Sequence, residues 1–156
     1  MLTVEYTGSV GASLVADRAY RSGELIQRIE GYQITTCPTY QTIQISADRH
    51  INDLHVLAYL NHSCAPNTSV DTRALTVTAA RDIDAGETLT FFYPSTEWQM
   101  AQPFICLCGA AQCVRWVAGA RYLPIDILGR YFINQHIIDM LIAELDPPQI
   151  PRFRPK

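Results

Sequence analysis

Lysine is nearly absent from this 156-residue sequence: eleven of its twelve basic residues are arginine, and the single lysine is Lys156. Charged residues are also scarce, at 17% compared with about 25% in an average soluble domain, and the net charge is −3. Basic residues cluster only at Arg152, Arg154 and Lys156. We therefore expect no direct binding to nucleic acid.

Long apolar runs are absent as well. No stretch approaches the roughly 18 consecutive apolar residues that a membrane-spanning helix needs, and the start of the chain lacks a charged segment followed by an apolar one. We therefore expect no membrane association and a soluble, intracellular protein, in either the nucleus or the cytoplasm. Hydrophobic residues make up 48% of the sequence, which is enough for the core of one domain.

Short segments of alternating or continuous hydrophobicity dominate the first 94 residues, separated by turn-forming residues. They span residues 2–6, 14–16, 24–29, 42–46, 68–70, 74–80 and 88–92. The turn at 71–73 predicts that 68–70 pairs with 74–80. Residues 53–60 predict a short helix capped by Asn52 or Asp53. The pattern as a whole predicts a mainly β fold.

A helical pattern begins at Pro124 and is stopped by Pro147 and Pro148. Its apolar stripe consists of Leu128, Tyr131, Ile138, Leu141, Ile142 and Leu145. We predict one long C-terminal helix within 121–147 that packs on the β core, followed by a flexible tail at 148–156. The alternative use of the stripe is a dimer interface, and we favour a monomer over a homodimer.

Five cysteines are present, and three of them crowd into Cys106-Leu-Cys108-Gly-Ala-Ala-Gln-Cys113. Three thiolates on one tight loop can surround a Zn²⁺ ion, which prefers four ligands in a tetrahedron. The fourth ligand is predicted to be Cys64, with Cys37 as its competitor. In a chain without a secretion signal this crowding favours a metal site over disulfides, and unrelated free thiols are the alternative interpretation.

Two further segments combine polar and aromatic groups. Residues 61–67 read Asn-His-Ser-Cys-Ala-Pro-Asn, and residues 86–93 read Gly-Glu-Thr-Leu-Thr-Phe-Phe-Tyr. Considered alone, each has an ordinary structural explanation. The first is a polar turn with a structural His62, and the second is a strand that ends in the amphipathic Tyr93.

Together and in this order, these segments resemble the SET-domain methyltransferase family with its post-SET zinc segment. Residues 61–67 match its N-H-S-C-x-P-N motif, 86–93 are similar to its G-E-E-L-T-x-D-Y strand, and the clustered cysteines match its C-x-C-x4-C. Residues 11–16 are similar to its G-x-G-x-x-A turn, with Ser13 at the second glycine. Phe92 stands at the usual acidic position, Ala58 and Tyr59 replace the common Arg-Phe, and the insert that usually walls the substrate groove is short.

The resemblance implies a SET-type fold of small curled β-sheets with a knot-like core. Residues 1–100 would form the SET catalytic domain and residues 101–120 the post-SET zinc-binding segment. S-adenosylmethionine (SAM) would bind to Gly11, Ser13, Leu14, Asn61, His62, Tyr93 and Leu107, with the leucine covering the adenine. The implied Zn²⁺ ligands are Cys64, Cys106, Cys108 and Cys113.

Tyr93 would be the catalytic residue, and its hydroxyl would orient the acceptor amine. Val70, Phe91 and Trp98 are the candidate residues of the acceptor channel, although for Trp98 we favour the alternative that it fastens the post-SET loop to the core. Because Phe91 and Val70 carry no hydroxyl that would hold a blocking water, we expect methylation beyond the first methyl group. Five acidic residues could line a substrate groove, but we interpret them as ordinary surface carboxylates: Glu30, Asp48, Asp53, Asp71 and Glu97.

The leading hypothesis is therefore a SAM-dependent N-methyltransferase that acts on protein lysine. One alternative is a SET-fold enzyme that acts on a small molecule, including one whose reaction is not a methyl transfer. The other alternative is a non-catalytic SET-like binding module that keeps the zinc and the shape.

Overall fold

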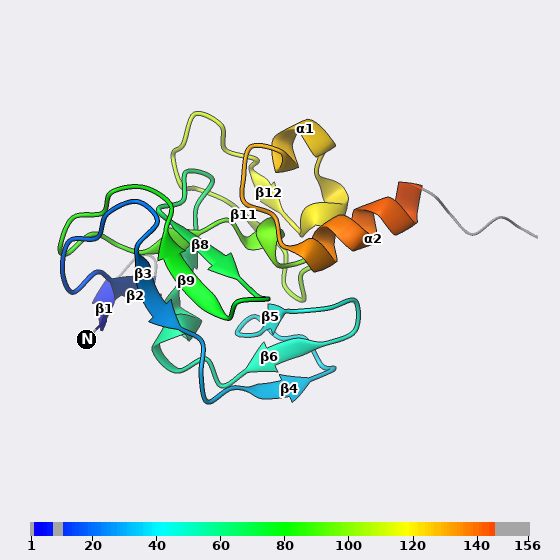
Figure 1. The fold of residues 1–156 in the computed structure, drawn as a ribbon. Coiled ribbons are helices and arrows are strands. Elements are labelled where there is room, and N and C mark those ends of the chain that lie inside the picture. Colours follow the sequence, from blue (N-terminus) through cyan, green and yellow to red (C-terminus); the bar gives the residue numbers. More distant parts are fainter. Residues whose placement is uncertain (1, 8–10, 146–156) are drawn as a thin grey trace, which may run out of the picture.

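The computed structural model describes residues 2–7 and 11–145, and shows several small sheets with few helices (Figure 1). The strands are β1 (Thr3–Thr7), β2 (Gly11–Val15), β3 (Leu25–Arg28), β4 (Gln33–Thr35), β5 (Ile43–Gln44), β6 (His50–Asn52), β7 (Asn61–His62), β8 (Thr68–Asp71), β9 (Thr76–Ala79), β10 (Thr90–Phe91), β11 (Phe104–Ile105) and β12 (Trp116–Val117). The helices are the 3₁₀ turns η1 (His55–Tyr59), η2 (Tyr93–Ser95) and η3 (Ala120–Tyr122), and the α-helices α1 (Ile125–Leu128) and α2 (Gln135–Leu145). The mainly β prediction is confirmed, and the predicted tail at 148–156 lies outside the described residues.

The described strands form five sheets of two or three strands each. The pairs are β1–β2, β7–β10 and β11–β12, and the three-stranded sheets have the orders β3–β9–β8 and β4–β6–β5. The predicted pairing across 71–73 is confirmed, with Val70 of β8 opposite Val77 of β9. The Asp71 carboxylate accepts hydrogen bonds from the backbone N–H groups of Arg73 and Ala74, which closes this turn.

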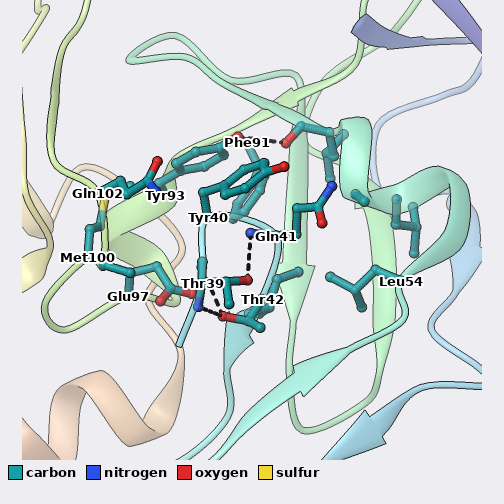
Figure 2. A pocket seen from close by; sticks show the side chains of 15 residues that line it. Thr39, Tyr40, Gln41, Thr42, Leu54, Phe91, Tyr93, Glu97, Met100 and Gln102 are labelled. Atoms are coloured by element: carbon teal, nitrogen blue, oxygen red, sulfur yellow. Dashed lines mark hydrogen bonds between the residues drawn. The ribbon is translucent and has the colours of Figure 1, made fainter. Parts of the chain in front are cut away.

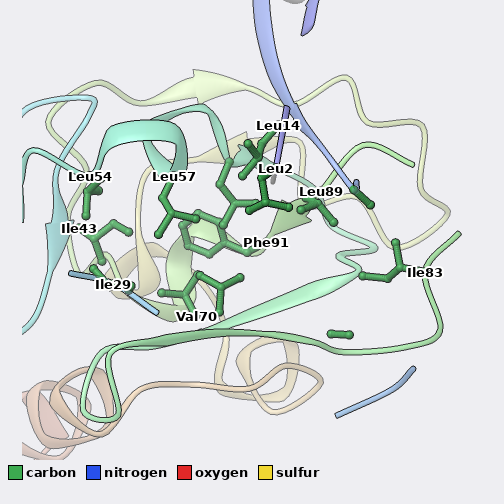
Figure 3. Close-up of a cluster of buried hydrophobic side chains, with 14 of the residues drawn as sticks. Leu2, Leu14, Ile29, Ile43, Leu54, Leu57, Val70, Ile83, Leu89 and Phe91 are labelled. Carbon is green, nitrogen blue, oxygen red and sulfur yellow. The ribbon is translucent and has the colours of Figure 1, made fainter. Parts of the chain in front are cut away.

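The main hydrophobic core of the described residues includes Phe91 of β10 (Figure 3), and two smaller clusters lie around Phe92 and around Cys64. The alternation of β8 and β9 explains part of this core, because Val70 and Val77 are buried while their strand neighbours are partly exposed. Leu14 of β2 and Leu57 of η1 join the same cluster. The core thus packs against β10, the strand that leads into Tyr93.

The short helix predicted over 53–60 is only the 3₁₀ turn η1, and its predicted caps are wrong. No side chain caps η1, and its N-cap is Leu54. Asp53 and His55 have φ values of 58° and 50°, in the left-handed region. A regular α-helix cannot start through such residues, so the Asn52 side chain instead accepts the backbone N–H of Asp53.

The predicted long C-terminal helix corresponds to α2, but it begins only at residue 135. Just before it, the Asn134 amide donates hydrogen bonds of 2.9 Å to the carbonyl oxygens of Val70 and Ser95. The amide oxygen of Asn134 accepts the backbone N–H of Thr72 at 2.8 Å. These buried bonds tie the start of α2 to β8 and η2, and they explain why the chain leaves helical geometry between α1 and α2.

The predicted apolar stripe packs in part. Leu128 is buried, and Tyr131 and Leu141 pack against its cluster, whereas Ile138, Ile142 and Leu145 are exposed. The buried residue of α2 is Ile137, which the predicted stripe did not include. Within the part of the chain that the structure describes, no helix has the length and apolar character required to cross a bilayer.

Candidate active site

Two segments far apart in the sequence form the centre of the site. β7 and β10 pair in parallel, with Asn61 opposite Thr90 and His62 opposite Phe91. The backbone N–H of Ser63 continues this pairing by donating to the Phe91 carbonyl oxygen at 3.1 Å. The polar motif at 61–67 and the strand leading to Tyr93 are therefore neighbours, as the resemblance implied.

Tyr93 is the first residue of η2, at the point where the chain leaves β10. Its backbone N–H donates to His62 Nδ1 at 3.2 Å, and its hydroxyl donates to the Leu60 carbonyl oxygen at 3.1 Å. Burial, and then the charge of Glu97, raise the pKa of Tyr93 to about 12. The phenol is therefore neutral and held in one direction, and its oxygen lone pairs remain able to accept a hydrogen bond.

Asn61 connects this centre to the segment that resembles the cofactor turn. Its side-chain amide donates to the Ala12 carbonyl oxygen at 2.9 Å and to the Ser13 hydroxyl at 3.0 Å. Ser13 lies within β2, in regular pairing with Glu5, so serine meets no backbone strain at this position. The Leu14 side chain is fully buried in the core, so that only its backbone can contact a ligand.

His62 packs among aromatic rings and beside a cysteine. Its ring centroid lies 5.2 Å from that of Tyr93 and 5.7 Å from that of Phe104, and its Nε2 lies 3.3 Å from Cys64 Sγ. Burial lowers the pKa of His62 to about 4, so the imidazole is neutral at physiological pH. His62 thus links the Tyr93 backbone to the cysteine cluster.

Four cysteine thiols gather at one point, and they are the four predicted ligands. The sulfur atoms of Cys64, Cys106, Cys108 and Cys113 all lie within 4.8 Å of one another. Cys64 Sγ lies 3.9 Å from both Cys106 Sγ and Cys113 Sγ. A tetrahedral Zn²⁺ with Zn–S bonds of 2.3 Å separates its sulfurs by about 3.8 Å, so this donor set fits zinc.

The local fold explains how the thiols meet. The β11–β12 hairpin closes with a backbone hydrogen bond from Cys106 to Arg115, and Gly109 turns the chain with a φ of 74°. Cys37, the competing candidate, is exposed and is not part of the cluster. Leu107 is 90% exposed, between two of the thiols.

Phe92, which stands at the usual acidic position before Tyr93, stacks on the ring of Tyr131. The Phe92 ring lies 3.7 Å from that of Tyr131, nearly parallel at 6°, and the Tyr131 hydroxyl donates to the Cys64 carbonyl oxygen at 2.8 Å. This contact fastens the segment before α2 to the cysteine cluster.

A pocket opens on the other side of Tyr93 (Figure 2). Its cavity volume is about 40 Å³, and it is lined by Thr39, Tyr40, Gln41, Thr42, Ile43, Leu54, Leu57, Ala58, Leu60, Phe91, Tyr93, Glu97, Met100, Ala101 and Gln102. Phe91 lies in its wall, as predicted for the acceptor channel. The segments 39–43 and 100–102 carry no motif, and sequence reasoning did not assign them to the site.

Val70 and Trp98, the other two channel candidates, do not line this pocket. Val70 is fully buried against Val77 in the core. Trp98 packs in a cluster with Phe92 and Ala120, and a side chain at Gly119 would collide with the Trp98 carbonyl oxygen. Trp98 therefore fastens the segment after η2 to the residues around Ala120, which was the favoured of its two interpretations.

Glu97 is the functional candidate that the sequence interpretation missed. It was expected on the surface, but it is only 8% exposed and lines the pocket. Its Oε1 accepts the backbone N–H of Gln44 at 2.8 Å and the Thr96 hydroxyl at 3.1 Å. Burial raises the pKa of Glu97 to about 7. The only available signal was a lone acidic residue four positions after Tyr93, directly before a tryptophan.

Comparison with known proteins assigns a family to this geometry. The family model for the SET domain matches residues 11–94, which is more than half of the chain. The chain is 39% identical over 141 residues to a protein of Aspergillus flavus named methyltransferase flvH, covering 89% of this chain and 77% of that protein. It is 30% identical over 133 residues to the Arabidopsis thaliana histone-lysine N-methyltransferase ASHH3, covering 70% of this chain and 36% of that protein.

A likeness to a solved structure supports the fold. KRYPTONITE, crystallised in complex with mCHG DNA and SAH, matches with a TM-score of 0.59 and 20% sequence identity. The match covers 74% of this chain and 28% of KRYPTONITE. The chain therefore spans most of the A. flavus relative but about a third of the Arabidopsis and KRYPTONITE chains.

Proposed function

Since this chain belongs to the SET-domain family of methyltransferases, we propose that it transfers a methyl group from SAM to the nitrogen of an aliphatic amine held beside Tyr93. The observation that carries the proposal is the position of the Tyr93 hydroxyl. It is hydrogen-bonded to the Leu60 carbonyl oxygen, next to the β7–β10 pair and in the wall of a narrow pocket.

The residues that would hold SAM lie on the β2 and β7 side of Tyr93. Asn61 is already bonded to Ala12 and Ser13, which supports a joint role of β2 and β7 in cofactor binding. Leu107 is exposed and therefore available to cover an adenine ring. When bound, SAM supplies an electrophilic methyl group on a sulfonium.

The chain's own residues would align the amine and keep it neutral. A primary alkylamine has a pKa of about 10.4 in water, so it must lose a proton before it can attack. Apolar walls at Leu57 and Phe91 favour the neutral form, and the Tyr93 oxygen accepts one amine N–H. The nitrogen lone pair then forms the N–C bond while the C–S bond breaks, its electron pair stays on sulfur, and the released proton leaves through water in the pocket.

Alignment and removal of water supply most of the acceleration in such a transfer. Holding two reactants in a well-oriented arrangement can lower the activation barrier by about 7 kcal/mol or more. The rigid support of Tyr93 by His62 and Leu60 fits this requirement, because both hydrogen bonds limit the movement of the phenol.

Zn²⁺ would be held by Cys64, Cys106, Cys108 and Cys113. Its role would be structural, because four thiolates leave no open position for a substrate. Cys64 follows His62 by two residues, so the metal would tie the cofactor strand β7 to the β11–β12 hairpin.

Two classes of acceptor are compatible with this chemistry. A protein lysine is supported by the Arabidopsis relative, which is named a histone-lysine N-methyltransferase. A small amine is supported by the narrow pocket and by the relative of similar length, which is named only a methyltransferase. In either class, the absence of a hydroxyl on Phe91 leads us to expect dimethylated or trimethylated products.

Calorimetry with SAM, followed by transfer of labelled methyl groups, tests the proposal. Zinc-loaded protein should bind SAM and then label the nitrogen of a lysine peptide or of a small alkylamine. Mass spectrometry after exhaustive reaction should show more than one methyl group on the acceptor. A zinc-loaded protein that does not bind SAM would exclude both acceptor classes, and a product limited to one methyl group would refute the role assigned to Phe91.

A further inference from the structure

The pocket beside Tyr93 has two polar ends. At one end, the Tyr93 hydroxyl meets the Leu60 carbonyl oxygen, and at the other end, the Glu97 carboxylate lies beside the segment 39–42. Figure 2 shows the Tyr93 ring extending away from Glu97, so that the hydroxyl and the carboxylate occupy different parts of the pocket. The remaining lining is largely apolar, and includes Leu57 and Phe91.

Glu97 is a buried carboxylate that lacks a cationic partner among the described residues. Gln44 and Thr96 donate to its Oε1, but its Oε2 accepts no hydrogen bond from the described residues and lies 3.9 Å from His50 Nε2. Burial, and then the charge of His136, lower the pKa of His50, so that this imidazole is uncharged at neutral pH. No arginine forms an ion pair with Glu97 in the described part of the chain.

An unpaired carboxylate in such a place is unfavourable. Taking a carboxylate out of water costs free energy that hydrogen bonds to one oxygen recover only in part. The raised pKa of Glu97, about 7, expresses this cost. A cationic ligand in the pocket would remove the imbalance, because it would pair with the carboxylate and favour its ionised form.

We propose that Glu97 is a specificity-determining residue that binds a second, positively charged group of the acceptor while the reacting amine lies beside Tyr93. The inference rests on the proposed function of amine methylation. The acceptor class is an unbranched aliphatic amine with a second ammonium group at its other end. A peptide-bound lysine side chain has one ammonium group only, and it would leave Glu97 unpaired.

The shape of the pocket agrees with this class of acceptor. A cavity of about 40 Å³ has room for about three water molecules or a short alkyl chain. Its apolar walls suit a chain of methylene groups, and its two ends suit two different states of an amine. The ammonium beside Glu97 stays charged, whereas the nitrogen beside the neutral Tyr93 can lose its proton.

Matched pairs of amines test the inference directly. The substrates are the unbranched α,ω-diamines from 1,3-diaminopropane to 1,6-diaminohexane, the n-alkylmonoamines of the same carbon numbers and a lysine-containing peptide. In wild type, kcat/KM for the preferred diamine should exceed that for its monoamine at least about tenfold, the lower range for a hydrogen bond to a buried charge. In Glu97→Gln this preference should disappear, chiefly through KM, while the affinity for SAM stays unchanged.

The controls separate the inference from the proposed function. Glu30→Gln changes an exposed carboxylate outside the pocket and should keep the wild-type preference. Equal rates with diamine and monoamine in wild type, or a preference retained in Glu97→Gln, would overturn the inference and leave amine methylation intact. Failure to methylate any amine despite SAM binding would overturn both. If Glu97→Gln does not fold, the ratio of kcat/KM for diamine to that for monoamine in wild type tests the inference by itself.

Discussion

The two ends of the pocket differ in how the sequence builds them. The Tyr93 end consists of residues inside recognisable motifs, and its hydrogen bonds join Leu60 and His62 to Tyr93. The Glu97 end consists of segments without any motif, and the buried Glu97 carboxylate accepts hydrogen bonds there from Gln44 and Thr96. Both ends thus depend on contacts between segments that are remote in sequence, but only the Tyr93 end carries motifs by which the sequence reveals it.

The largest effect on the Tyr93 end is expected from loss of the zinc proposed for the cysteine cluster. Cys108→Ser should lower the zinc content from one per chain toward zero and loosen the C-terminal half, because structural zinc sites contribute about 10 kcal/mol of binding free energy. Zinc analysis and thermal unfolding measure this effect. Cys37→Ser, which changes an exposed thiol outside the cluster, is the matched control. A variant that still holds one zinc per chain would show that the ligand set is different.

The next effect concerns the hydroxyl of Tyr93 alone. Tyr93→Phe keeps the ring but removes the group that orients the amine, so turnover should fall by about 10³-fold. SAM affinity, measured by calorimetry, should change less than about threefold, because the ring contacts with His62 and Phe104 remain. Turnover close to that of wild type would exclude a catalytic role for the phenol.

At the other end, the charge of Glu97 should appear in the pH dependence of stability. Its pKa rises from 4.5 to about 7 on folding, so the folded state binds the proton more tightly than the unfolded state. The stabilisation by the protonated form is complete below about pH 4.5 and is lost as the pH rises through 7. Relative to Glu97→Gln, wild type should therefore lose up to about 3 kcal/mol of unfolding free energy over this range.

Urea unfolding of both proteins at several pH values measures this difference. Comparison with the variant cancels the pH dependence of zinc binding, which both proteins share. A difference in unfolding free energy that does not change between pH 4.5 and 8 would show that Glu97 is ionised at no cost in the folded protein. The two ends of the pocket would then be alike in their electrostatics.

Some elements of the fold were predicted correctly from the sequence and others were not. The pairing of β8 with β9 was predicted correctly, because alternating apolar residues flank a short turn at Asp71. The proximity of Asn61 and Tyr93 followed only from the resemblance, since local pattern says nothing about a parallel pair of strands separated by 27 residues of chain. The caps predicted for η1 failed, because Asp53 and His55 adopt positive φ values that composition does not reveal.

The candidate site, too, was predicted only in part from the sequence. The four thiols were predicted from spacing and resemblance, and the structure brings them together. Glu97 was interpreted as a surface carboxylate and Val70 as a channel residue, yet Glu97 lines the pocket and Val70 does not, because burial of a single side chain depends on segments that are remote in sequence. Sequence pattern thus predicts which chemical groups are present more readily than which of them share a cavity.

The smallest expected effect on stability is that of removing the Tyr131 hydroxyl. Tyr131→Phe keeps the stack on Phe92 but removes the hydrogen bond to the Cys64 carbonyl oxygen, so the unfolding free energy should fall by about 1 kcal/mol. Tyr122→Phe, at an exposed ring, is the matched control and should have no measurable effect on the same unfolding curve. Equal curves for the two variants would show that the Tyr131 hydroxyl does not support the cysteine cluster.

The proposed methyl transfer from SAM to an amine beside Tyr93 is best tested by locating the transferred methyl group. Zinc-loaded wild type is incubated with methyl-labelled SAM and the panel of amines, and the product is analysed by tandem mass spectrometry with Tyr93→Phe in parallel. We expect label on nitrogen in the wild-type reaction and its near absence with the variant. Label on carbon or oxygen, or SAM binding without any labelled amine, would contradict it.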